Sequence, residues 1–166
     1  MHIKVCGMRD AENIRLLCEL PITYIGFIFY GPSKRFVGED FPVANTNLVP
    51  ANIKKTGVFV NATKDEIIQK VLKYSLQTIQ LHGHETPEFC LEIKDEGLEV
   101  FKAFGIDSQF DFEVVKQYEN VCDYFLFDTK TEQHGGSGKK FDWNMLNNDI
   151  LKKQYILSGG IGNDDI

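Results

Sequence analysis

The sequence predicts an α/β fold with a parallel sheet, and it favours a (β/α)8 TIM barrel over a doubly wound open sheet. Short, mostly apolar stretches alternate with helical patterns, and their starts recur roughly every 20 to 30 residues, as in strand–helix units. No G-x-G-x-x-G follows the first apolar stretch and no Walker-type loop is present, which counts against a nucleotide-binding open sheet. About seven strand–helix units fit into residues 1–166, which we expect to form a single domain.

Strands are expected where short apolar runs lie between turn-forming residues. The expected strands are residues 3–6, 24–29, 56–60, 78–81, 99–104, 124–127 and 155–157.

Helices are expected between the strands, and several carry start or stop signals. Pro21 stops the first, and Thr86-Pro87 has the cap-then-proline form of a helix start. Residues 39–52 contain two prolines and three asparagines, so a helix there must be short or irregular. The other expected helices are residues 10–20, a helix capped by Asn61 or Thr63 that runs to Tyr74, residues 87–97 and 112–118, and helix starts near 142 and 163.

Composition points to small-molecule chemistry in one soluble domain. A chain of 166 residues with 43% hydrophobic and 25% charged content can bury one good core. The net charge is −6 and the basic residues are dispersed, so we expect no nucleic-acid partner. No apolar run approaches the roughly 20 residues that span a bilayer, and no signal-peptide pattern opens the chain, so we expect no membrane association and a cytoplasmic location.

The four cysteines are far apart and form no C-x-x-C pair, so neither a disulfide framework nor a zinc knuckle is indicated. His82 and His84 form H-x-H, but no further histidine or carboxylate cluster lies beside them in sequence. We therefore expect no metal and no cofactor, and we place His82 at a strand end, where it is structural or lines the pocket.

Polar residues and glycines gather where the expected strands end, and in a barrel these ends form the catalytic rim. They are Cys6-Gly7 after the first strand, Ser33-Lys34-Arg35 after the second, Asn61 after the third, Gln80 to Gly83 at the fourth, Asp128 after the sixth and Ser158-Gly159-Gly160 after the seventh.

These segments together resemble one family. They read K-V-C-G, G-F-I-F with S-K-R downstream, G-V-F-V-N, Q-L-H-G, F-D with G-G-S-G-K-K-F-D-W, and L-S-G-G-I, in this order. Together they are similar to phosphoribosylanthranilate isomerase, the barrel enzyme of tryptophan biosynthesis. The resemblance covers essentially the whole chain and implies an Amadori rearrangement of a phosphorylated aminosugar.

The resemblance also implies roles for individual residues. Asp128 matches the general acid and Cys6 the general base. Arg35 matches the arginine that faces the anthranilate moiety, although Lys34 stands where proline is common. For binding the phosphorylated substrate, the matching positions are Gln80, Gly136 in a glycine-rich lid (residues 135–138), and Gly159 and Gly160 at half of a phosphate site.

The eighth strand–helix unit is expected to be missing, because such barrels normally need roughly 200 residues. Seven strands leave two open edges, so we expect weak or absent activity in a 166-residue form, and a monomer or homodimer with a tendency to associate through the open edge. Two alternatives stay open. One is another phosphosugar barrel enzyme, such as a metal-dependent pentose phosphate epimerase; the other is a barrel fragment that binds a ligand without turnover.

Overall fold

The computed structural model describes residues 2–130, 138, 140–147 and 151–165. The chain separates into two compact units, Met1–Gln80 and Leu81–Ile166. Strand order follows chain order in each: β1-β2-β3-β4 in the first unit, with Leu81, the last residue of β4, just past the division, and β5-β6-β7 in the second. Among the described helices, none is both long enough and apolar enough to cross a membrane.

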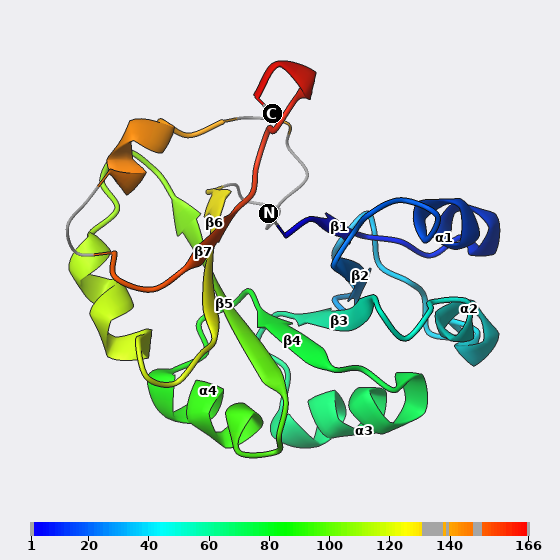
Figure 1. Ribbon diagram of the computed structural model, residues 1–166. Coiled ribbons are helices and arrows are strands. Elements are labelled where there is room, and N and C mark those ends of the chain that lie inside the picture. The colour runs from blue at the N-terminus through cyan, green and yellow to red at the C-terminus, as the bar shows by residue number, and fades with distance from the viewer. Residues whose placement is uncertain (1, 131–137, 139, 148–150, 166) are drawn as a thin grey trace. The chain divides into compact units, whose positions relative to one another are not determined.

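In the first unit, parallel strands carry three helices on one side (Figure 1). The pairing sets Cys6 beside Gly26, and Gly26 beside Thr56. Ile14 and Ile67 from the helices are fully buried, as is Ile25 of the sheet, so the helices cover an apolar face. The elements are β1 (Lys4–Cys6), α1 (Ala11–Leu17), β2 (Tyr24–Ile28), α2 (Val43–Asn47), β3 (Lys54–Phe59), α3 (Lys64–Tyr74) and β4 (Thr78–Leu81).

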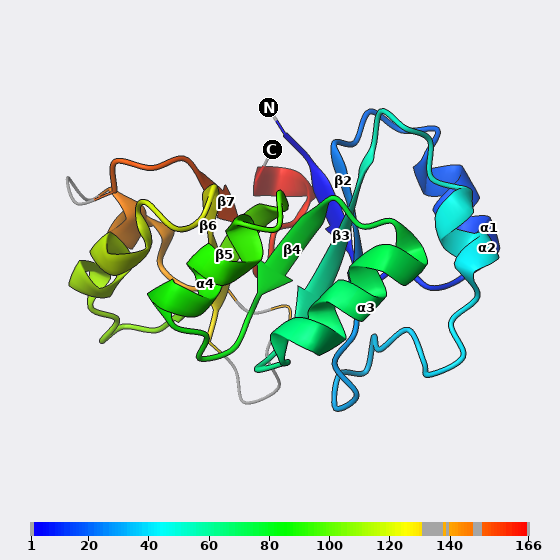
Figure 2. The ribbon, with the colours of Figure 1, turned by 90° about the horizontal axis from the view of Figure 1, so that it is seen from below.

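In the second unit, α4 lies alongside β5, as Figure 2 shows. Strands β5 and β6 pair in parallel, with Gly105 opposite Asp128, and β6 pairs with β7 through Phe127 and Leu157. Phe127 and Phe104 pack together on the helix side of these strands. The elements are α4 (Pro87–Lys94), β5 (Glu99–Ile106), η1 (Phe112–Tyr118), β6 (Tyr124–Thr129), η2 (Trp143–Leu146), β7 (Tyr155–Leu157) and η3 (Asn163–Asp165), where η marks a 3₁₀ helix.

The helix starts form as their caps predict. The Thr63 hydroxyl accepts from the Glu66 amide while the Glu66 carboxylate accepts from the Thr63 amide, a capping box that holds the start of α3. Thr86 caps α4, with Pro87 as the first helical residue. Asn61 does not cap α3; it has a positive φ of 53° in the preceding loop.

Several element ends differ from the prediction, and two of these differences have a clear cause. Helix α1 stops at Leu17 instead of Leu20, because the amides of Glu19 and Leu20 turn back to carbonyls three residues earlier. Strand β6 runs on to Thr129, since its last two residues pair with the end of β5. Asp128 therefore lies inside the strand and not after it.

Candidate active site

Cys6 ends β1 and is half-buried. A Cβ placed on Gly26 of the neighbouring strand would lie 2.7 Å from the Cys6 Sγ and 3.1 Å from the Lys4 Nζ. Glycine at position 26 thus leaves room for the thiol, and the Lys4 ammonium lies close to it on the same face of the sheet. A thiol beside a positive charge is a setting in which cysteines take part in chemistry.

Arg35 folds back from the loop after β2 onto the end of β1. Its Nη1 donates to the Cys6 carbonyl at 3.0 Å. Gly7 has a φ of +85°, and a Cβ there would lie 2.7 Å from the Arg35 Cδ, so a glycine lets the side chain lie across the turn. The exposed guanidinium can bind a carboxylate through two parallel hydrogen bonds.

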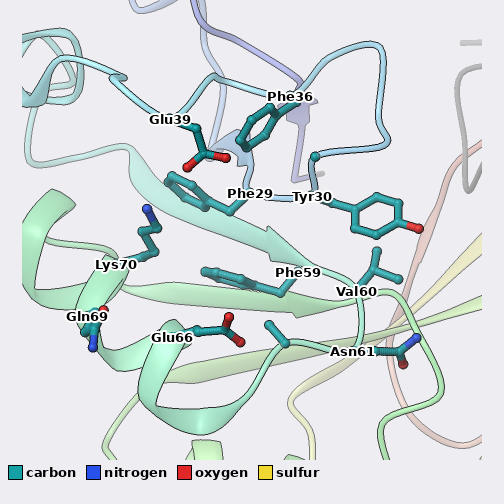
Figure 3. Close-up of a pocket in the computed structure, with 12 residues that line it drawn as sticks. Phe29, Tyr30, Phe36, Glu39, Phe59, Val60, Asn61, Glu66, Gln69 and Lys70 are labelled. Atoms are coloured by element: carbon teal, nitrogen blue, oxygen red, sulfur yellow. The ribbon is translucent and has the colours of Figure 1, made fainter.

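A pocket of about 450 Å³ lies in the first unit at the ends of β2 and β3 (Figure 3). Its rings of Phe29 and Phe59 stack at 5.4 Å between centroids, and Lys70 reaches over Phe29 at 5.7 Å. The Glu66 carboxylate on its wall is bonded to Thr63 in the capping box. Asn61 lines this pocket but neither Cys6 nor Arg35 does, so it is separate from the predicted catalytic group of this unit.

Asp128 is the buried acid of the second unit. The residue is 7% exposed, and its Oδ1 accepts from the Thr129 amide at 2.9 Å. The Nε2 of His82, which follows β4, lies 3.9 Å from the Asp128 Oδ2. A buried carboxylate beside an imidazole is a pair suited to proton transfer.

The loop after β7 lies against this carboxylate. The Ser158 amide donates to the Phe127 carbonyl at 2.8 Å and brings Gly159 next to Asp128. A Cβ on Gly159 would lie 2.7 Å from the Asp128 Oδ1, and the φ of Gly159 is +87°, so a larger residue would clash and be strained. Gly160 also has a positive φ, 69°.

The structure says less about two other residues expected to bind the substrate, Gln80 and Gly136. Gln80 is buried in β4, 4% exposed. Gly136, expected in the lid, lies outside the described residues.

The second unit also contains a buried ion pair that was not predicted from the sequence, between the Lys102 Nζ and the Glu85 Oε2, 2.8 Å apart. The sequence feature that could have revealed this pair is the lysine inside the apolar strand V-F-K-A-F, where a solvated lysine is not expected.

These features define a class of protein: an α/β fold of the (β/α) barrel kind, with polar and ionisable side chains at the carboxyl ends of parallel strands. The solved phosphoribosyl anthranilate isomerase of Thermus thermophilus superposes with a TM-score of 0.85 at 27% identity, covering 99% of this chain and 80% of that one. That of Thermotoga maritima gives 0.85 at 31% identity, covering 100% and 80%. The predicted TIM-barrel fold is confirmed.

Sequence comparison narrows the class to one family. A family model described as N-(5'phosphoribosyl)anthranilate (PRA) isomerase matches residues 3–166. An N-(5'-phosphoribosyl)anthranilate isomerase of Parabacteroides distasonis is 48% identical over 163 residues, covering 97% of this chain and 73% of the relative. That of Phocaeicola vulgatus is 44% identical over 161 residues, covering 97% and 76%.

The chain belongs to the N-(5'-phosphoribosyl)anthranilate isomerase family. Its reaction is the conversion of N-(5'-phosphoribosyl)anthranilate to 1-(o-carboxyphenylamino)-1-deoxyribulose 5-phosphate in tryptophan biosynthesis. This confirms the predicted activity and sets aside the alternative of a different phosphosugar barrel enzyme.

Proposed function

We propose that Asp128 and Cys6 carry out this isomerisation as general acid and general base. The observation that carries the proposal is the Asp128 carboxylate itself, buried at the end of β6 with the His82 imidazole 3.9 Å away and Gly159 against it. The other support is the Cys6 thiol, half-buried at the end of β1 beside Lys4 and Arg35.

The reaction needs two proton transfers on the sugar. The acid gives a proton to the ring oxygen as the bond from that oxygen to the first carbon breaks, and the anthranilate nitrogen supplies the electrons for a C=N bond. The base then removes the proton from the second carbon, and the resulting enolamine rearranges to the ketose. Asp128 performs the first step and Cys6 the second.

Arg35 binds the anthranilate carboxylate in this proposal. Its guanidinium is exposed and its Nη1 bonds the carbonyl of Cys6, so a substrate held by the remaining N–H groups is held next to the base. Gln80 and Gly136 complete the proposed substrate contacts.

Gly159 and Gly160 contribute to phosphate binding. Both have positive φ, and successive amides in such a turn point towards a common anion. A related phosphoribosyl anthranilate isomerase structure contains the reduced product, a 5-phosphate, and we infer a phosphorylated ligand for this chain as well.

Anthranilate fluorescence during turnover of N-(5'-phosphoribosyl)anthranilate tests the assignment of the base. Cys6→Ser should reduce kcat by about 100-fold or more, because the hydroxyl is a much weaker base than a thiolate. Cys18→Ser is the matched control, since Cys18 is also a half-buried thiol but caps the end of α1. A normal rate in Cys6→Ser, with an unchanged circular dichroism spectrum, would remove Cys6 from the mechanism.

We also infer a cytoplasmic enzyme that is a monomer or a homodimer. All four cysteines are free, which suits a reducing compartment. The Thermotoga maritima relative is described as a dimeric enzyme from which monomers were generated, and sedimentation of this chain would decide between the two states.

A further inference from the structure

Lys102 and Glu85 form an ion pair that is almost completely removed from water. Lys102 is 2% exposed in the middle of β5, and Glu85, just before α4, is 6% exposed. Desolvating two charges costs several kcal/mol per ion, and well-packed apolar residues often stabilise a fold as well or better. Stability alone therefore does not explain why these two charges are buried here.

Its hydrogen bonds converge on the backbone around one residue. The Lys102 Nζ donates to the Gly83 carbonyl at 2.8 Å and to the Leu81 carbonyl at 3.4 Å, which are the carbonyls on either side of His82 in the chain. The Glu85 carboxylate accepts from the Gly83 amide at 2.9 and 3.1 Å. The two charges thus hold the peptide units that flank His82.

Two aromatic rings enclose the ammonium. The ring centroids of Phe104 and Tyr118 lie 5.7 and 5.9 Å from the Lys102 Nζ, within the range of cation–π attraction. The Tyr118 hydroxyl donates to the Glu85 carbonyl at 3.0 Å, so η1 fixes the same turn. The ammonium has little freedom to leave the two carbonyls.

We call the Lys102–Glu85 ion pair the clamp. The clamp and the proposed acid, Asp128, lie on opposite faces of the sheet. Phe127 packs against Phe104 and against Phe112 of η1, with centroids 6.0 and 5.9 Å apart, so it points to the helix face, as do Phe104 and Lys102. Asp128 follows Phe127 and points the other way. The backbone on either side of His82 bonds to the clamp, and the His82 ring lies beside the Asp128 carboxylate.

We propose that Lys102 and Glu85 are positioning residues for the isomerisation, which hold His82 so that its imidazole stays beside Asp128. The inference rests on the proposed role of Asp128 as the acid. Without the clamp, we expect the His82 backbone to shift and the imidazole to leave the carboxylate for part of the time. Misplacement by about 1 Å can cost about 100-fold in rate.

The test is the double variant Lys102→Met/Glu85→Gln, which removes both charges together and leaves no single buried ion. It should keep the circular dichroism spectrum and the KM for N-(5'-phosphoribosyl)anthranilate, while kcat falls on the order of tenfold to 100-fold. The pH dependence of kcat should also change, because the acid has lost its neighbour. Lys94→Met is the control. It breaks another ion pair of the same unit, between Lys94 and Asp123 at 2.9 Å, and this pair does not touch His82.

A mutant cycle with His82→Gln separates positioning from general structural damage. His82→Gln should lower kcat, and adding Lys102→Met/Glu85→Gln to it should lower kcat no further. Additive losses, or a normal kcat in either the clamp variant or His82→Gln, would overturn the proposal. If the double variant does not fold, Tyr118→Phe, which removes the hydroxyl that bonds the Glu85 carbonyl and leaves both charges in place, carries the same cycle.

The failure of the clamp proposal and the failure of the proposed function give different results. A normal kcat in Asp128→Asn would refute the role of Asp128 as the acid and, with it, the role proposed for the clamp. A low kcat in Asp128→Asn together with a normal kcat in the clamp variant removes only the clamp.

Discussion

The four thiols of the chain differ in burial, and burial makes the two most buried ones, Cys90 and Cys122, harder to ionise. Desolvation raises the pKa of Cys90 to about 12 and that of Cys122 to about 11. Both Cys90 and Cys122 are fully buried, whereas Cys6 is half-buried at a strand end. Only the thiolate is a strong nucleophile, so these differences are measurable.

Alkylation with iodoacetamide at pH 8 should therefore label Cys6 much faster than Cys90 or Cys122 in the folded chain. The rates should become similar in concentrated urea, where burial is lost. Peptide mass spectrometry after timed quenching gives the individual rates. Equal labelling of Cys90 and Cys6 in the folded chain would contradict the burial of Cys90.

At the scale of elements, the sequence predicted the strands and helix starts well because their causes are local. A threonine before a helical pattern caps it, as Thr63 and Thr86 do, and short apolar runs become strands. Element ends were less well predicted. The last two residues of β6 are in the strand because β5 offers partners for them, and this pairing joins residues 23 apart in sequence, Gly105 with Asp128.

The candidate site also divides into residues with a local sequence signal and contacts that depend on long-range packing. Cys6, Arg35 and Asp128 could be selected because short motifs at strand ends carry them. The contacts of Asp128 with His82 and Gly159, and the clamp of Lys102 and Glu85, arise from packing between segments that are distant in sequence. A single sequence does not reveal which of its buried polar residues meet.

The loop after β7 offers a prediction at the element scale. Gly159→Ala should lower both stability and kcat, because alanine at a φ of +87° is strained by about 1–2 kcal/mol and its Cβ would press on Asp128. Gly97→Ala is the matched control: Gly97, after α4, has a φ of +79° but open space around it. Urea unfolding measures the strain and fluorescence turnover the activity.

The two variants should lose similar stability from the backbone, but only Gly159→Ala should lose kcat. Equal activity in both would mean that Gly159 does not shape the surroundings of Asp128.

For the whole molecule, acid should destabilise the fold. A hydrogen bond with Lys130 lowers the pKa of Asp107, one with Lys140 lowers that of Asp165, and the Thr63 amide lowers that of Glu66. A carboxyl whose pKa is lower in the folded state contributes stability above its unfolded pKa of about 4, and this is lost as pH falls through the folded value.

Tm measured from pH 6 to pH 2.5 should therefore fall mainly below about pH 4.5. The change should be smaller in 1 M salt, because the lysine partners are exposed and screened. A Tm that stays constant over this range would contradict a contribution from these carboxylates.

In the proposed mechanism, the buried carboxyl group of Asp128 donates the proton that opens the sugar ring. The most direct test is the kcat of Asp128→Asn with N-(5'-phosphoribosyl)anthranilate, compared with the unaltered chain and with Asp40→Asn, an exposed aspartate in the loop before α2. We expect kcat to fall by about 100-fold to 10,000-fold in Asp128→Asn and to stay unchanged in Asp40→Asn. A folded Asp128→Asn variant that turns over at the normal rate would contradict the account.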